Sequence, residues 1–142
     1  MPTLSPDMVI RRWFDELWNQ GREQTIVDLL AADAKLHGLP TPDGQPIVGP
    51  AAFTMFFRRF RQAFPDIHVA VTRTVTENDM VAAYCDVRGT HLGDALGTPA
   101  TMKPVSFSGL CMGKVAGGQI VEGWNCFDFL TCYQQLGLLP KL

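Results

Sequence analysis

The sequence predicts an α+β domain in which helices near the N-terminus precede a meandering antiparallel sheet. Apolar residues in the first half recur at three- and four-residue spacing, which is typical of amphipathic helices. The second half is rich in valine, isoleucine, threonine and aromatic residues and is divided by turn sequences, which is typical of strands. With 142 residues, the chain is expected to form one domain over residues 1–142.

Three helices are expected before the sheet. Ser5 can cap the first helix and Gly21 ends it. A shorter helix fits residues 22–31, and a third fits residues 50–64, where Pro65 stops it. The apolar positions of this third helix are phenylalanines: Phe53, Phe56, Phe57, Phe60 and Phe64.

Four strands with short connections are expected in the second half. Turn sequences at residues 77–79 and 116–118 separate neighbouring strands. Because a parallel crossover needs a dozen or more residues, such short connections make the neighbours antiparallel. A short helix over residues 131–136 then closes the chain at Gly137. The expected strands are residues 67–76, 80–90, 105–115 and 119–127.

Composition and charge exclude several classes of function. A net charge of −2 provides no basic field for nucleic acid or acidic membranes, and 46% hydrophobic residues exclude a disordered chain. No apolar run is long enough to span a bilayer, and the N-terminus lacks the regions of a signal peptide, so a cytoplasmic protein is expected. Four cysteines without a Cys-x-x-Cys pair are expected to be reduced thiols, and three scattered histidines predict no metal site.

Alternation along the last strand brings two carboxylates to one face beside a tryptophan. Glu122, Trp124 and Asp128 share this face. Desolvation beside Trp124 would raise the pKa of such a carboxyl toward neutrality and make it a usable general acid or base. Structural roles are equally open: Glu122 can pair with Arg88 or a backbone amide, and Asp128 can cap the last helix.

His91 is a second candidate for chemistry. It stands between Gly89 and Gly93 at the end of a predicted strand, where a sharp turn can bring the imidazole to the rim of a pocket. We therefore expect its ring to face a cavity rather than solvent, although a structural histidine fits the same position. The aromatic residues of the first helix and of the strands can form ordinary core or line an apolar cavity.

In order and spacing, several segments resemble the SnoaL-like polyketide cyclases, also called ester cyclases. The resemblance implies the cone-shaped fold of nuclear transport factor 2, with a curved, mixed, mostly antiparallel sheet around a pocket closed by N-terminal helices. It also implies a homodimer and the use of no metal or organic cofactor. The matching segments are Trp18-Asn19, Phe64-Pro65-Asp66, Asn78-Asp79-Met80-Val81-Ala82, Gly89-Thr90-His91-Leu92-Gly93, Ile120-Val121-Glu122-Gly123-Trp124 with Asp128 following, and Gln135-Leu136-Gly137.

The same resemblance implies roles for individual residues. Asp128 matches the position of the family's acid/base in an intramolecular aldol ring closure. His91 would lie in the same pocket, and His37 is a third candidate for catalysis. The residues expected to bind substrate are Phe14, Trp18, Phe57, Tyr84, Phe107, Glu122 and Trp124.

Two functions remain open at this point. The first is a cofactor-free acid/base enzyme for aldol-type ring closure or a related isomerisation of a small apolar substrate that bears a carbonyl group. The second is a non-catalytic domain whose pocket binds a hydrophobic small molecule. Asp128 and His91 in one cavity would favour the enzyme. A homodimer is expected through the open face of the sheet, on apolar residues such as Val69, Val71 and Val87.

Overall fold

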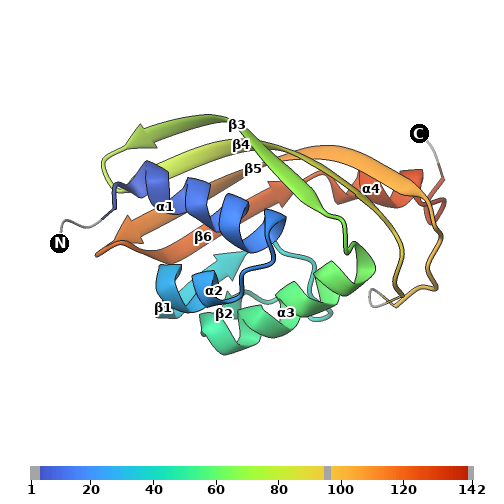
Figure 1. Cartoon of the computed structure of the whole chain (residues 1–142), viewed down its shortest axis with the longest axis horizontal. Coiled ribbons are helices and arrows are strands. Elements are labelled where there is room, and N and C mark those ends of the chain that lie inside the picture. Colours follow the sequence, from blue (N-terminus) through green and yellow to red (C-terminus); the bar gives the residue numbers. More distant parts are fainter. Residues whose placement is uncertain (1–3, 95–96, 141–142) are drawn as a thin grey trace.

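A computed structural model describes residues 4–94 and 97–140 of the chain. These residues form a strongly curved sheet of six strands, with helices packed against its concave face (Figure 1). Within the same ranges, no helix combines the length and the apolar character needed to cross a membrane. In chain order the elements are α1 (Pro6–Arg12), η1 (Trp13–Asn19), α2 (Gln24–Leu29), β1 (Leu30–His37), β2 (Ile47–Val48), α3 (Gly49–Ala63), β3 (His68–Glu77), β4 (Met80–Thr90), β5 (Pro104–Ala116), β6 (Gln119–Phe127) and α4 (Phe129–Gln135).

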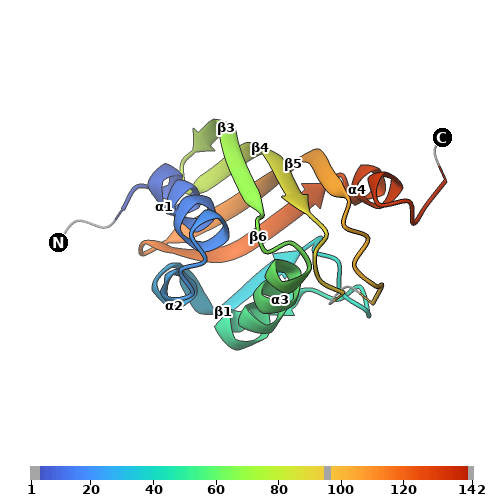
Figure 2. The same ribbon diagram turned by 45° about the vertical axis from the view of Figure 1, so that its right-hand side comes forward.

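The sheet is mixed and mostly antiparallel, as the resemblance implied. Its strand order is β2-β1-β6-β5-β4-β3. The four long strands β3 to β6 pair as an antiparallel meander, because the turns between β3 and β4 and between β5 and β6 are only two residues long. β1 runs parallel to β6 and brings the first half of the chain into the same sheet. Figure 2 shows α1 and α3 on one side of the sheet and α4 at its far end.

Two strands of the first half were not expected from the sequence. The helix predicted over residues 22–31 ends at Leu29, and β1 begins at Leu30. Ala31, Ala34 and Leu36 are buried on β1 between α3 and β6. A short apolar run of this kind fits a helix or a strand equally well, and pairing with β6 decides between them.

The first helix changes its geometry midway along its length. Its second half, η1, is a π-helix, in which the turn is wider than in an α-helix. Trp13, Phe14, Leu17 and Trp18 are all buried, and the two tryptophan rings pack on phenylalanines of α3. Gly21 ends the segment with a φ of +71°, as the sequence predicted.

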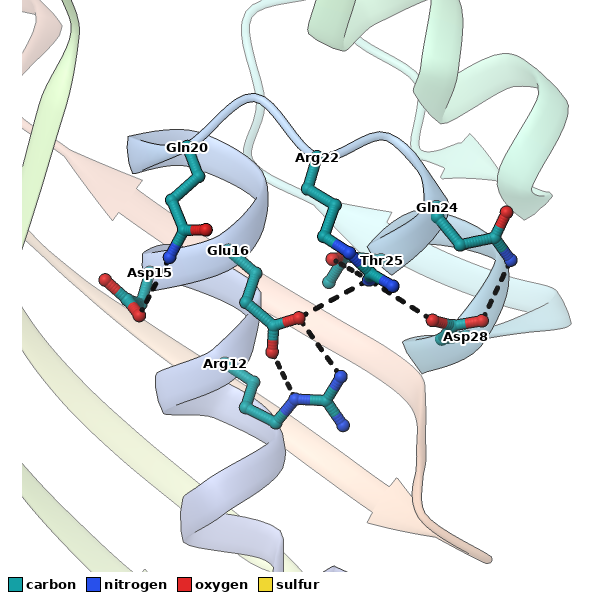
Figure 3. Close-up of polar contacts among 8 residues, drawn as sticks. All are labelled: Arg12, Asp15, Glu16, Gln20, Arg22, Gln24, Thr25 and Asp28. Carbon is teal, nitrogen blue, oxygen red and sulfur yellow. Dashed lines mark hydrogen bonds and ion pairs between the residues drawn. The ribbon is translucent and has the colours of Figure 1, made fainter.

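A charged network joins η1 to α2 on the surface (Figure 3). The Arg12 guanidinium donates to the Glu16 carboxylate, and the Arg22 Nη1 atom lies 3.4 Å from both Glu16 and Asp28. The hydrogen bond from Arg12 is the largest cause that lowers the pKa of Glu16 below its ordinary value. The network connects the first helical segment to α2, but because its side chains are partly exposed its contribution to stability is small.

Candidate functional site

An apolar cavity of about 80 Å³ lies between the concave face of the sheet and the helices. The cavity is partly open to solvent. Three walls enclose it: α1 and η1 on one side, α3 on a second, and the sheet on the third. Aromatic side chains dominate its lining, with Trp13, Phe14, Trp18, Phe53, Phe56, Phe60, Phe107, Phe127 and Phe129 all exposed to the space inside.

The helical walls are built by interlocking aromatic rings. The Trp18 ring lies 5.0 Å from the Phe57 ring and 5.7 Å from the Phe60 ring, both edge to face. Trp13 contacts Phe53 at 5.0 Å between ring centroids. Offset and edge-to-face aromatic pairs are stabilising beyond the area they bury, so these rings hold η1 against α3 in a defined geometry.

The sheet wall combines large apolar side chains with small residues on the inward face of β5 and β6. Gly113 stands opposite Gly123, and Cys111 stands opposite Asn125. A Cβ atom on Gly113 would collide with the side chain of Ile10, so the missing side chain lets α1 approach the sheet closely. The glycine pair therefore helps to set the depth of the cavity.

A β-bulge decides which face of β6 lines the cavity. The register shifts so that Val115 pairs with Ile120 but Lys114 pairs with Glu122, which leaves Val121 as the extra residue. After the bulge, Gly123, Asn125 and Phe127 point inward. Glu122 and Trp124 therefore do not line the cavity: they do share a face, as alternation predicts, but it is the outer face.

The carboxylate of Glu122 pairs with His37 on that outer face. The Nε2 atom of His37 lies 2.7 Å from a carboxylate oxygen of Glu122, and its ring stacks on Trp124 with centroids 5.8 Å apart. Neither His37 nor Glu122 lines the cavity. The structural alternative in which Glu122 pairs with Arg88 does not occur, because Glu122 stands opposite Lys114 on β5 whereas Arg88 on β4 stands opposite Ser106, near the other end of β5.

Asp128 caps α4, the structural alternative that the sequence left open. Its carboxylate accepts the backbone N–H of Thr131 at 3.0 Å and the hydroxyl of Thr131 at 2.6 Å. The hydroxyl is the largest cause and the N–H the next, and together they lower the pKa of Asp128 below its ordinary value. The expected raised pKa is wrong, since the side chain is exposed and does not line the cavity. Capping also explains why α4 begins at Phe129, two residues earlier than expected.

His91 is buried, but it lies beside the cavity rather than in its lining. Its ring is fully buried and packs on Phe64 with centroids 5.4 Å apart. The Nδ1 atom accepts the backbone N–H of Thr101 at 3.1 Å, while the buried Nε2 atom has no hydrogen-bond partner among the described residues. The expectation that His91 avoids solvent is confirmed, and its placement in the pocket wall is wrong.

The remaining substrate-binding candidates divide by face. Phe14, Trp18 and Phe107 line the cavity. Phe57 is buried behind Trp18, so it supports the wall without lining it. Tyr84 points to the outer face of β4 and is 41% exposed.

The apolar residues named for the dimer face also point inward. Val69 and Val87 are buried and line the cavity, and Val71 packs against the core. The outer face of the sheet instead exposes Leu110 and Met112 of β5, beside Tyr84 of β4. An apolar outer face therefore exists, but other residues form it.

Comparison with known proteins agrees with this architecture. The sequence profile of the SnoaL-like polyketide cyclases matches residues 8–136. The chain belongs to this family. No curated protein matches it. IdmH of Streptomyces antibioticus, a candidate polyketide cyclase, has a similar structure with a TM-score of 0.81 and 32% sequence identity, covering 94% of this chain and 99% of IdmH.

Two further solved structures share the fold of this SnoaL-like chain. A candidate SnoaL-like polyketide cyclase from Jannaschia sp. CCS1 has a TM-score of 0.83 and 22% identity, covering 95% of this chain and 93% of its own. AclR of Streptomyces galilaeus, a candidate hydroxylase, has a TM-score of 0.81 and 23% identity, covering 96% and 83%. The expected cone-shaped fold of nuclear transport factor 2 is thereby confirmed.

Asn125 is the residue of this SnoaL-like pocket that sequence reasoning missed. Among the described residues that line the cavity, it is the one with an amide, hydroxyl or charged side chain. Alternation along the strand places Asn125 on the face opposite Glu122 and Trp124, and in the structure this opposite face is the one that lines the cavity. Gly113 and Gly123 are the sequence feature that could have identified the inner face, because a glycine within a strand often marks a place where a ligand or another backbone approaches closely.

The lining limits the chemistry that this site can perform. No carboxylate and no imidazole occurs among its described lining residues, and the sheet and helices contribute mostly hydrocarbon. Such a surface binds uncharged, apolar molecules and excludes water around them. It can hold a flexible chain in a folded conformation, but it offers few groups for proton transfer.

Proposed function

We propose that this protein is a cyclase that closes a ring in a small, largely apolar substrate bearing a carbonyl group. Membership of the SnoaL-like family supports ring closure, and the aromatic cavity supports an apolar substrate. The observation that carries the proposal is the cavity itself, which is apolar and walled by packed aromatic rings.

Confinement is the main contribution of the protein in this proposal. An aldol-type closure or a related isomerisation joins two parts of one chain, and holding them about 3–3.5 Å apart raises their effective concentration by orders of magnitude. A folded conformation of an apolar chain is favoured in the cavity because the hydrophobic effect rewards compact shapes that fill it. Proton transfer by Asp128 is not part of the proposal, because its carboxylate is exposed outside the described cavity lining and is engaged by Thr131, whose hydrogen bonds lower its pKa.

Turnover of acyclic substrates tests the proposal. We would incubate the protein with acyclic β-keto thioesters of N-acetylcysteamine whose otherwise apolar chains carry a second ketone, placed so that attack by the α-carbon closes a five- or six-membered ring, and follow products by liquid chromatography and mass spectrometry. The proposal predicts a cyclic product with the mass of the substrate, or that mass less one water, formed at least about a hundredfold faster than in buffer. Binding without any turnover across the set would contradict it.

A non-catalytic role in binding a hydrophobic molecule is the second candidate. The observation that favours it is the absence of carboxylate and imidazole groups from the described cavity lining. In that case the same thioesters would bind to the protein and would be recovered chemically unchanged. The mass-spectrometric assay therefore separates the two functions.

A further inference from the structure

We propose that the Asn125 amide is the hydrogen-bonding group that orients an uncharged carbonyl of the ligand in the cavity. This inference rests on the proposed function, since it assumes that the cavity is where the ligand binds. Asn125 enters from the middle of the sheet wall, where Cys111 stands opposite it on β5 and Phe127 follows it on β6. The surrounding hydrocarbon makes a single amide the strongest polar contact that a ligand can find there.

The orientation of the amide is fixed by the strand beside it. The Nδ2 atom of Asn125 lies 3.0 Å from the backbone oxygen of His37 at the end of β1. Because a carbonyl oxygen can only accept, the nitrogen must face His37, and the placement of nitrogen and oxygen in the amide is not arbitrary. Gly38, with a φ of +81°, lets β1 come this close, since a Cβ atom there would collide with the backbone oxygen of Asn125.

One N–H and the side-chain oxygen of Asn125 then remain for a ligand. Neither atom has a hydrogen-bond partner within residues 4–94 and 97–140. The second N–H can donate to a ketone or ester carbonyl, and the same bond would strengthen as negative charge develops on that oxygen during ring closure. No cationic side chain occurs among the described lining residues, so free carboxylates are disfavoured and neutral carbonyls are the matching class.

A ligand pair of equal shape tests this assignment. Acetophenone carries a carbonyl where α-methylstyrene carries a methylene group, so the two differ mainly in the hydrogen-bond acceptor. We would measure both dissociation constants by nuclear magnetic resonance titration for the wild-type protein, Asn125→Leu and Asn125→Thr. The quantity compared is the ratio of the two constants, because it cancels the different hydration of the free ligands between variants.

The expected result is a change in that ratio and not in apolar binding. Loss of one neutral hydrogen bond should shift the ratio by roughly fivefold against acetophenone in Asn125→Leu, with α-methylstyrene bound as before. Asn125→Thr retains a hydroxyl donor and should recover part of the preference. Its β-branched side chain also suits a strand, which makes it the second variant if Asn125→Leu folds poorly.

The outcomes separate this inference from the proposed function. An unchanged ratio in a folded Asn125→Leu protein that binds both ligands would overturn the role of Asn125 and leave the cavity as the binding site. Failure of the wild-type protein to bind either ligand would overturn the cavity as the site and the inference with it.

Discussion

Filling the cavity should stabilise the protein while abolishing ligand binding. Cys111→Leu is the perturbation, because Cys111 lies on the sheet wall and is buried at 7% exposure. At about 24 cal/mol per Å³, an enclosed empty cavity of about 80 Å³ would cost the fold roughly 2 kcal/mol, which is an upper limit for this partly open one. A leucine that fills about half of this space should therefore recover up to about 1 kcal/mol.

The assay combines thermal unfolding with acetophenone titration. For a chain of 142 residues, a gain of about 1 kcal/mol corresponds to a rise in Tm of roughly 3–4 °C. Cys126→Leu is the matched control, since it makes the same change on the outer face of β6, where Cys126 is exposed. A Cys111→Leu protein that is less stable than wild type and still binds acetophenone would refute the reasoning, because it would show that no functional space lies beside this residue.

Three further outcomes follow from the described contacts. Asp128→Ala should lower the Tm by removing the α4 cap while leaving the thioester turnover rate within about threefold, and a loss of two orders of magnitude would restore Asp128 to the mechanism. The pKa of Glu16 is lowered mainly by the hydrogen bond from Arg12. Burial is the largest single influence on Asp66 and raises its pKa, but the hydrogen bonds from Thr90 outweigh it and the pKa is lowered. Both carboxylates therefore stabilise the fold at pH values above their unfolded pKa. This contribution is lost as the pH falls through the pKa values of the folded state. The free energy of unfolding, measured with denaturant, should therefore decline below about pH 4, and Glu16→Gln should make that decline shallower. We also propose that the outer face joins two copies, so Leu110→Lys should sediment at 15.7 kDa while wild type sediments at twice that mass.

Much of the fold could be predicted because local patterns and short turns determine it. The apolar spacing of α3 and the alternation of β5 each agree with the burial in the structure. β1 could not be predicted in the same way, since its residues become a strand by pairing with β6, 87 to 90 residues later in the chain. Non-local pairing of this kind leaves no periodic signal in a short apolar run.

The candidate site was predicted less well than the fold, and one structural feature explains most of the difference. The bulge at Val121 shifts the phase of β6, so the face with Glu122 turns outward and the face with Asn125 turns inward. Nothing in the local sequence marks a bulge at that position. Asp128 differs because its capping role was visible from the sequence, and only the geometry of Thr131 decides that its pKa falls rather than rises.

The three tryptophans provide the most direct test of the central claim, that the concave cavity is the ligand site. Trp13 and Trp18 line the cavity, whereas Trp124 stacks on His37 on the outer face and serves as an internal control. Titration of ¹⁵N-labelled protein with acetophenone should move the indole signals of Trp13 and Trp18 along one saturating curve and leave that of Trp124 in place. A shift confined to Trp124, or no shift of any indole at saturating ligand, would contradict the claim.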